Sequence, residues 1–222
     1  MPMKAILFDL DGTLLDTLDD LADAANRVLD HAGLPTHAHS AYRHFIGDGS
    51  RMLITRAMPE DHRTPERIED YLTRFKADYS RNWKTATRPY PGIPALLHDL
   101  CVRAIPRAVV TNKPQAFAES CINHFFPEPS FQMIWGQKEG VPLKPHPLPA
   151  LEAAKHLGIS PQECLMLGDS DVDMKTARSA GMLPVGAAWG FRSTAELVNA
   201  GAAHIVRSPM EIKAWFDGNR SG

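Results

Sequence analysis

Apolar runs and helical periodicities alternate along most of the chain. Runs rich in hydrophobic and β-branched residues predict six strands, at 4–9, 107–112, 131–136, 164–169, 183–189 and 203–206. Between the later strands, apolar residues recur at the helical spacing and predict helices at 93–101, 114–124, 147–157, 171–181 and 193–200. Because nearly continuous apolar strands alternate with helices, this pattern predicts a parallel sheet covered by helices on both faces.

Residues 17–88 break this alternation, because they carry helical stripes and no convincing strand. One stripe comprises Leu18, Leu21, Ala22, Ala25, Val28 and Leu29, and the other comprises Ile68, Tyr71, Leu72, Phe75 and Tyr79. The predicted fold class is therefore α/β, with a Rossmann-like core domain at 1–16 and 89–222 and an inserted α-helical cap domain at 17–88. An insertion after the first strand belongs above the carboxyl ends of the strands, where a lid would cover bound ligands.

Composition and charge restrict the classes of partner. The chain has 222 residues, 44% hydrophobic and 23% charged, with a formal net charge of −2, which is typical of a soluble globular protein without a basic nucleic-acid-binding face. No apolar run approaches the ~18 residues of a membrane span, and Asp9 comes too early for a signal peptide. Cys101, Cys121 and Cys164 lie inside apolar stretches, which predicts buried, reduced thiols in a cytoplasmic protein. The oligomeric state is unknown from the sequence.

Polar residues cluster where the predicted strands end. The first strand ends in "DLDGT", the second in "VVTNK" and the fourth in "GDSDVD", and "LKPHP" follows the third after a short loop. Parallel strands bring their carboxyl ends to one edge of a sheet, so we expect these four clusters to converge on one crevice.

Each cluster taken alone has a simpler interpretation. "DLDG" is compatible with an Asp-Gly hairpin turn, "TNK" with a helix N-cap, and Lys144 with an ordinary solvated lysine. "DSDVD" resembles half of a calcium loop, but Met174 replaces the required glycine and Ala180 the bidentate glutamate, which excludes an EF-hand. Four coincidences at four strand ends favour a single site.

The combined residue types indicate phosphoryl transfer. Asp9, Asp169 and Asp173 would form a cage of hard oxygen ligands suited to Mg²⁺. Thr111, the backbone N–H groups near Asn112, and the ammonium of Lys144 would bind an anion. A divalent metal beside an anion site is the arrangement of a phosphoryl-transfer enzyme.

In this order, "DLDGTLLDT", "VVTNK", "KPHP" and "GDSDVD" resemble the four motifs of the haloacid dehalogenase-like hydrolase superfamily, and the resemblance covers essentially the whole chain. It implies that Asp9 is a nucleophile forming an aspartyl-phosphate and that Asp11 is the general acid and base. The metal set implied is the Asp9 carboxylate, the Asp11 backbone carbonyl and Asp169, with Asp173 as a ligand or beside one. The implied phosphate contacts come from Thr111, Asn112, Lys144 and the turn amides, including those of Leu10 and Gly12.

The details "FIGDGSRMLI", "VVTNKP", "KPHPLPAL" and "AAWGFRS" most resemble the phosphoglycolate phosphatase-like branch. That resemblance implies hydrolysis of a small phosphate monoester, with 2-phosphoglycolate as the best candidate. We expect substrate choice to involve cap residues Gly47, Asp48, Gly49, Ser50 and Arg51, with Arg51 facing a substrate carboxylate. The competing role for Arg51 is that of a solvated arginine in the first turn of a helix.

Other activities stay open at this point. A sugar phosphate, a nucleotide or pyrophosphate are alternative substrates, and a β-phosphoglucomutase-like phosphotransferase is an alternative enzyme, although that branch typically carries a histidine in the first cap helix and here none precedes His31. A receiver-like phosphorylation switch uses similar residues but is about half this length and lacks the helical insertion.

Overall fold

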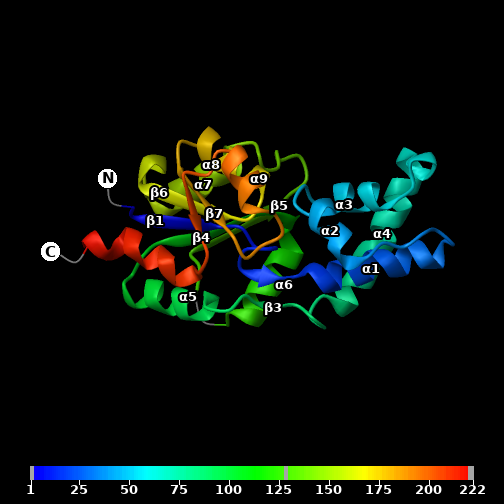
Figure 1. The fold of residues 1–222 in the computed structure, drawn as a ribbon, viewed down its shortest axis with the longest axis horizontal. Helices are drawn as coiled ribbons and strands as arrows, with labels where there is room; N and C mark the ends of the chain where they lie inside the picture. Colours follow the sequence, from blue (N-terminus) through cyan, green and yellow to red (C-terminus); the bar gives the residue numbers. More distant parts are fainter. Residues whose placement is uncertain (1–2, 128–129, 220–222) are drawn as a thin grey trace. The chain divides into compact units, whose positions relative to one another are not determined.

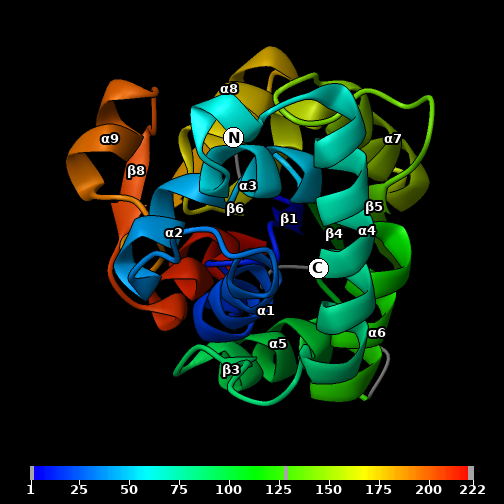
Figure 2. The same ribbon diagram turned by 90° about the vertical axis from the view of Figure 1, so that its right-hand side faces the viewer.

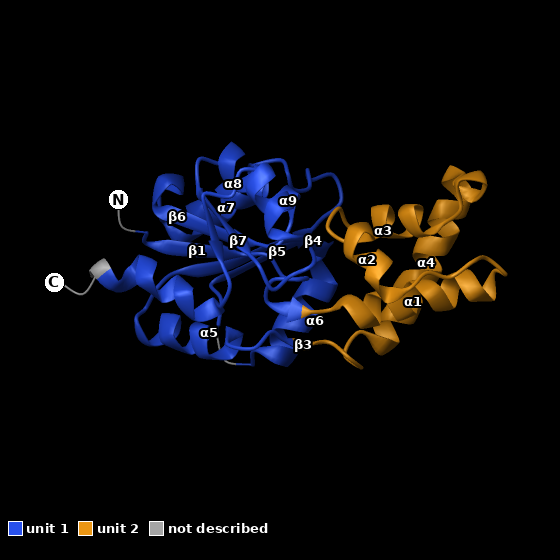
Figure 3. Ribbon diagram, viewed as in Figure 1, with its two compact units in different colours: residues 1–15, 89–222 blue, residues 16–88 orange. Residues whose placement is uncertain are grey.

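The structure is a computed structural model that describes residues 3–127 and 130–219. It divides the chain into two compact units, residues 1–15 with 89–222 and residues 16–88 (Figure 3). The first is called the α/β unit and the second the helical unit.

The α/β unit is built around a parallel sheet (Figure 1). Its strands are β1 (Ala5–Phe8), β4 (Arg107–Pro114), β5 (Met133–Gln137), β6 (Cys164–Gly168), β7 (Leu183–Ala187) and β8 (His204–Val206). The order is β5-β4-β1-β6-β7-β8, and every neighbouring pair is parallel. Among the described residues, these are the strands that the hydrophobic runs predict, so the predicted α/β class is confirmed.

Helices cover both faces of this sheet. They are α5 (Ile93–Val102), α6 (Gln115–Phe125), α7 (Leu148–Leu157), α8 (Asp171–Ser179) and α9 (Thr194–Asn199), with 3₁₀ helices η2 (Pro161–Glu163) and η3 (Pro209–Asn219). Alternate strand residues such as Leu7, Val110 and Met166 form one buried cluster with alanines of α7 and α8. Helices α5 and α6 lie on the opposite side of the sheet (Figures 1 and 2). The period of two along each strand thus supplies an apolar layer to each set of helices.

The position of β1 decides where a ligand site can form. The chain runs from β1 to β4 and β5 on one side, then returns to build β6, β7 and β8 on the other side. The carboxyl end of β1 therefore lies at the topological switch point, where open α/β sheets bind ligands. The four polar clusters of the sequence lie at or after the ends of β1, β4, β5 and β6, and these four strands are neighbours in the sheet in the order β5-β4-β1-β6.

The helical unit contains α1 (Leu18–His31), α2 (His39–Phe45), α3 (Ser50–Ala57), η1 (Glu60–His62) and α4 (Pro65–Asn82). The predicted stripe of α1 is buried throughout, and in α4 four members of the predicted stripe are buried while Ile68 is half-buried. Helix α4 begins with Pro65 after Thr64, whose hydroxyl accepts the Arg67 N–H, because proline suits the first helical position and threonine its cap.

Two very short strands, β2 (Leu15–Asp16) and β3 (Arg88–Pro89), pair where the chain leaves and re-enters the α/β unit. The sequence pattern predicts only helix from Thr17 to Arg88, because a strand of two residues is too short to show a period. Nearby, the buried carboxylate of Asp20 in α1 accepts the N–H groups of Ala86 and Thr87 and the Thr87 hydroxyl. These bonds fix the returning segment to α1 within the helical unit.

The expectation that all three cysteines are buried is wrong for Cys101, which is exposed, whereas Cys121 and Cys164 are buried. Helix α5 buries Ile93, Leu96, Leu97 and Leu100. Cys101 follows Leu100 by one position, which rotates it about 100° away from that stripe.

None of the helices within the described residues has both the length and the apolar character needed to cross a membrane.

Candidate active site

Asp9 follows β1 directly, and the sheet holds its backbone. Its N–H donates to the Leu167 carbonyl at 2.9 Å, which continues the pairing of β1 with β6. Its side chain is buried, and the Leu10 N–H donates to Asp9 Oδ1 at 2.7 Å. The nucleophile predicted from the sequence is therefore a buried carboxylate held on a rigid element.

Gly12 closes the turn that follows. Its φ is +83°, and its N–H donates to the Leu15 carbonyl at 2.9 Å. A Cβ atom at this position would lie 2.3 Å from Asp169 Oδ2. Both the left-handed backbone and the close approach of Asp169 therefore require glycine. In this structure the Leu10 and Gly12 amides are engaged within the protein, so their contact with a phosphate stays a prediction.

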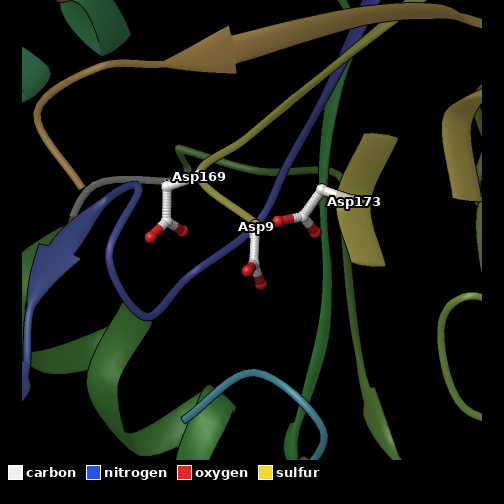
Figure 4. Close-up of side chains that lie close together, drawn as sticks. All are labelled: Asp9, Asp169 and Asp173. Carbon is white, nitrogen blue, oxygen red and sulfur yellow. The ribbon is translucent and has the colours of Figure 1, made fainter. Parts of the chain in front are cut away.

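Asp9, Asp169 and Asp173 bring their carboxyl groups together (Figure 4). One oxygen from each lies within 4.8 Å of the others, and all three residues are buried. Burial raises the pKa of Asp9 to about 7, and the charge of Asp173 adds to this effect. Burial, followed by the charges of Asp173 and Asp9, raises the pKa of Asp169 to about 8. These carboxylates repel one another strongly enough to favour a bound cation.

Lys144 supplies part of the compensating charge. Its Nζ lies 3.0 Å from Asp9 Oδ1 and 2.6 Å from Asp173 Oδ1, and its side chain is 2% exposed. Burial disfavours this ammonium, but Asp173 and Asp9 outweigh that effect and raise the pKa of Lys144 above its usual value. The simpler interpretation of Lys144 as an ordinary solvated lysine is therefore wrong.

The composition of this cluster fits a divalent cation. Three carboxylates beside one ammonium carry two net negative charges when all are ionised. The carboxylate oxygens are hard ligands of the kind that Mg²⁺ prefers. The fit therefore rests on both the charge and the donor atoms of the described residues.

Both oxygens of Asp173 are already engaged. Oδ1 accepts from Lys144, and Oδ2 accepts the N–H and the hydroxyl of Ser170 at 3.1 and 2.6 Å. The Asp173 N–H returns a bond to the Ser170 hydroxyl, which completes a capping box at the start of α8. Ser-x-x-Asp at the start of a helix is a readable capping signal, although the sequence interpretation assigned Asp173 only to the metal.

The segment after β7 is part of the site, and sequence reasoning gave it no role. The Phe191 N–H donates to Asp169 Oδ2 at 2.7 Å, and Thr13 Oγ1 donates to Asp169 Oδ1 at 3.0 Å. Trp189 Nε1 donates to the Thr13 carbonyl at 3.0 Å. A Cβ on Gly190 would lie 2.2 Å from Asp169 Cβ. Since β7 is the neighbour of β6, the rule that parallel strand ends converge could have identified "AAWGF" as well.

Thr111, Asn112 and Lys113 are consecutive residues of β4. The strand continues to Pro114, so the N-cap interpretation of "TNK" is wrong. Thr111 is buried, and the Asn112 amide both accepts the Lys144 N–H and donates to the Lys144 carbonyl, at 2.9 and 3.0 Å. The Asn112 side chain therefore positions Lys144. Its contact with a phosphate stays a prediction, as does that of Thr111.

Lys113 forms a second buried ion pair that the sequence interpretation missed. Its Nζ lies 2.9 Å from Asp11 Oδ1 and 3.2 Å from Asp11 Oδ2. Asp11 therefore does not join the three-carboxylate cluster through its side chain. The predicted metal contact of its backbone carbonyl is untested.

The predicted substrate residues Gly47, Asp48, Gly49, Ser50 and Arg51 belong to the helical unit. Asp48 pairs with Arg56 at 2.5 Å, and Arg51 pairs with Glu69 of α4. The negative charge of Asp48 is thus compensated by Arg56 within the same unit. Arg51 and Glu69 are both about half exposed, with side-chain exposures of 54% and 53%, and a substrate contact of Arg51 stays a prediction.

Known proteins are similar to this chain in sequence and in fold. A model of the family described as haloacid dehalogenase-like hydrolase matches residues 6–187. A phosphoglycolate phosphatase of Chromobacterium violaceum is 34% identical over 214 residues, covering 95% of this chain and 95% of that protein. One of Aquifex aeolicus is 33% identical over 189 residues, covering 85% and 86%. A crystal structure of a protein from Lactobacillus delbrueckii subsp. bulgaricus has a TM-score of 0.91 at 32% identity, covering 97% of this chain and 99% of the other.

Proposed function

This chain belongs to the haloacid dehalogenase-like hydrolase family and is a phosphatase, and we propose that it hydrolyses 2-phosphoglycolate to glycolate and phosphate in a Mg²⁺-dependent reaction. The observation that carries the reaction is the buried group of Asp9, Asp169 and Asp173 with Lys144 at the switch point of the sheet. The choice of substrate is supported by the relatives named phosphoglycolate phosphatase.

In the first chemical step, the Asp9 carboxylate attacks phosphorus, an aspartyl-phosphate forms, and the bond to the leaving oxygen breaks. Asp11 protonates this leaving oxygen. In the second step Asp11 takes a proton from water, the water oxygen attacks phosphorus, and the Asp9 carboxylate is released with inorganic phosphate. Thus Asp11 ends each turnover in its starting protonation state.

The remaining residues bind and orient. Asp9, Asp169, Asp173 and the backbone carbonyl of Asp11 would hold Mg²⁺, which when bound offsets negative charge on the carboxylates and the phosphoryl group. Lys144 and Thr111 would bind the transferring phosphoryl oxygens, with Asn112 keeping Lys144 in place. General acid–base catalysis alone supplies ~10²–10⁴-fold, so this electrostatic contribution is needed as well.

We also propose that residues 17–88 act as a cap that selects the substrate. Gly47 and Gly49 have φ values of +126° and +85°, which favour glycine. Because neither residue has a side chain, a small ligand could approach the backbone closely at these two positions. Arg51 offers the positive charge that a substrate carboxylate would need, which 2-phosphoglycolate has and simple sugar phosphates lack.

The test is a phosphate-release screen with Mg²⁺ over 2-phosphoglycolate, sugar phosphates, nucleotides and pyrophosphate. We expect 2-phosphoglycolate to give the highest kcat/KM, and EDTA to abolish release. A higher kcat/KM for another class contradicts the substrate proposal. In the same screen, Arg51→Gln should lower the preference for 2-phosphoglycolate over the sugar phosphates. Phosphate transfer between sugar positions would favour the mutase alternative, and a phosphorylated protein without turnover would favour the switch.

Asp9→Asn should reduce turnover below detection, because the amide cannot form the aspartyl-phosphate. Asp171→Asn is the matched control, since Asp171 lies on α8 near the site but pairs with Lys175 at the surface. Full activity of the Asp9 variant would rule out the nucleophile assignment.

A further inference from the structure

We propose that Lys113 is a positioning residue that holds the carboxylate of Asp11 where it can exchange protons with the reacting oxygens. This inference rests on the proposed function, in which Asp11 is the general acid and base. Neither the sequence motifs nor the relatives assign a role to Lys113.

The geometry of the ion pair is the first support. The Lys113 ammonium contacts both oxygens of the Asp11 carboxylate, at 2.9 and 3.2 Å. The side chain of Lys113 is 3% exposed and that of Asp11 is 13% exposed. Solvent therefore screens this pair weakly, and a charge-assisted bond to both oxygens restricts rotation of the carboxylate more than a single contact would.

Lys113 is held near the end of β4. It lies beyond the part of β4 that pairs with β1, and its N–H donates to Thr111 Oγ1 at 3.3 Å. A Cβ on Gly136 of β5 would lie 2.8 Å from the Lys113 carbonyl, so the two strands are closely packed here. A side chain whose backbone is closely packed in this way can hold a partner that sits in a turn.

Lys113 and Lys144 pair with different carboxylates. Lys144 pairs with Asp9 and Asp173, whereas Lys113 pairs with Asp11. Because Asp11 lies two positions from Asp9 and the three-carboxylate cluster repels a further negative charge, an attractive partner on the β4 side keeps Asp11 apart from that cluster. Asp11 can then serve the leaving group while Asp9 attacks phosphorus.

This role predicts a dependence on the leaving group. The alkoxide of glycolate is a poor leaving group that needs a proton, whereas p-nitrophenolate leaves without one. Lys113→Met should therefore lower kcat for 2-phosphoglycolate by about 10- to 100-fold, a fraction of the ~10²–10⁴-fold that general acid–base catalysis supplies. We expect KM to change less than about threefold, and the initial burst of p-nitrophenolate from p-nitrophenyl phosphate to keep nearly its original rate.

The experiment compares the wild type with Lys113→Met, Asp11→Asn and the double variant, using 2-phosphoglycolate for kcat and KM and p-nitrophenyl phosphate for the burst. Lys155→Met is the matched control, because Lys155 is 79% exposed on α7 and should leave every constant unchanged. Thermal unfolding establishes that each variant is folded. Lys113→Gln is the second variant, which removes the charge while keeping a donor for Asp11, and it should lower kcat in the same direction.

A lysine that acts through Asp11 has nothing left to position once Asp11 is asparagine. The double variant should therefore have the kcat of Asp11→Asn alone. A further loss in the double variant, or a raised KM with unchanged kcat in Lys113→Met, would overturn the inference and mean that Lys113 contacts the substrate directly. If Asp11→Asn alone keeps full turnover, the proposed role of Asp11 fails together with that of Lys113.

Discussion

At the scale of single residues, the negative charges of Asp9 and Asp11 are compatible because each side chain pairs with a different lysine. Asp9 lies 3.0 Å from Lys144, and Asp11 lies 2.9 Å from Lys113. Breaking a buried pair by removing one partner leaves an uncompensated charge and is usually strongly destabilising. For variants of Lys113 or Lys144, the free energy of unfolding therefore has to be measured as well as the turnover.

At Gly12, the effect of the left-handed backbone on stability can be separated from the effect of the close contact with Asp169. Gly12→Ala should reduce both turnover and stability, because the backbone is left-handed and the added methyl group would overlap Asp169. Gly33→Ala is the control, since its φ is +68° and nothing lies within 4 Å of an added Cβ. We expect the control to lose about 1–2 kcal/mol from the left-handed conformation alone.

Urea unfolding and phosphate release measure these two effects. If Gly12→Ala loses no more stability than Gly33→Ala and keeps its turnover, the close approach of Asp169 to this turn is not needed for stability or for activity.

At the scale of elements, loops that follow neighbouring strands hold one another in place. The segment after β7 contacts both the Asp169 carboxylate and the turn after β1. Helix α8 begins with a capping box whose aspartate also pairs with Lys144. The capping of a helix and the charge balance of the site are thus carried by one side chain, Asp173.

Trp189 provides the prediction at this scale. Trp189→Phe keeps a large ring but removes the donor to the Thr13 carbonyl, a hydrogen bond worth about 0.5–1.5 kcal/mol. Because Thr13 in turn donates to Asp169, we expect several-fold weaker binding of Mg²⁺ by calorimetry. Trp215→Phe is the matched control, since Trp215 packs edge-on against His204 in a different part of the α/β unit. Equal Mg²⁺ affinity in both variants would show that the Trp189 bond does not support the metal ligands.

At the scale of the whole molecule, the site makes stability depend on pH and metal. In the metal-free protein the pKa values of Asp9 and Asp169 are raised to about 7 and about 8, above the unfolded value near 3.9. Between these limits the folded state binds more protons than the unfolded state. This contribution to stability is therefore complete below about pH 4 and is lost as the pH rises to about 8.

Urea unfolding in EDTA across this range measures the effect, and Asp169→Asn should reduce the loss because it removes one of the two groups. Added Mg²⁺ should restore stability at the alkaline end, by about 2.7 kcal/mol at a hundred times its Kd. A free energy of unfolding that is the same in EDTA and in Mg²⁺ at pH 8 would contradict a metal site at this cluster.

Much of the fold could be predicted from the sequence because it depends on local patterns. The apolar runs of β1, β4 and β6 and the stripes of α1 and α4 repeat over a few residues, and each repeat indicates its own element. The pair β2 and β3 could not be predicted, since two residues carry no period. Cys101 was misjudged because its apolar surroundings in the chain conceal its position on the outward side of α5.

The sequence by itself determined which residue types stand at the strand ends, and therefore that Asp9, Lys144 and Asp169 would meet at the edge of a parallel sheet. Only the tertiary structure decided how they pair. Lys113 and Asp11 are 102 positions apart, and Trp189 and Thr13 are 176 positions apart. No repeat along the chain encodes such distances, because these contacts depend on the order of strands in the sheet and on the direction of each side chain at its end.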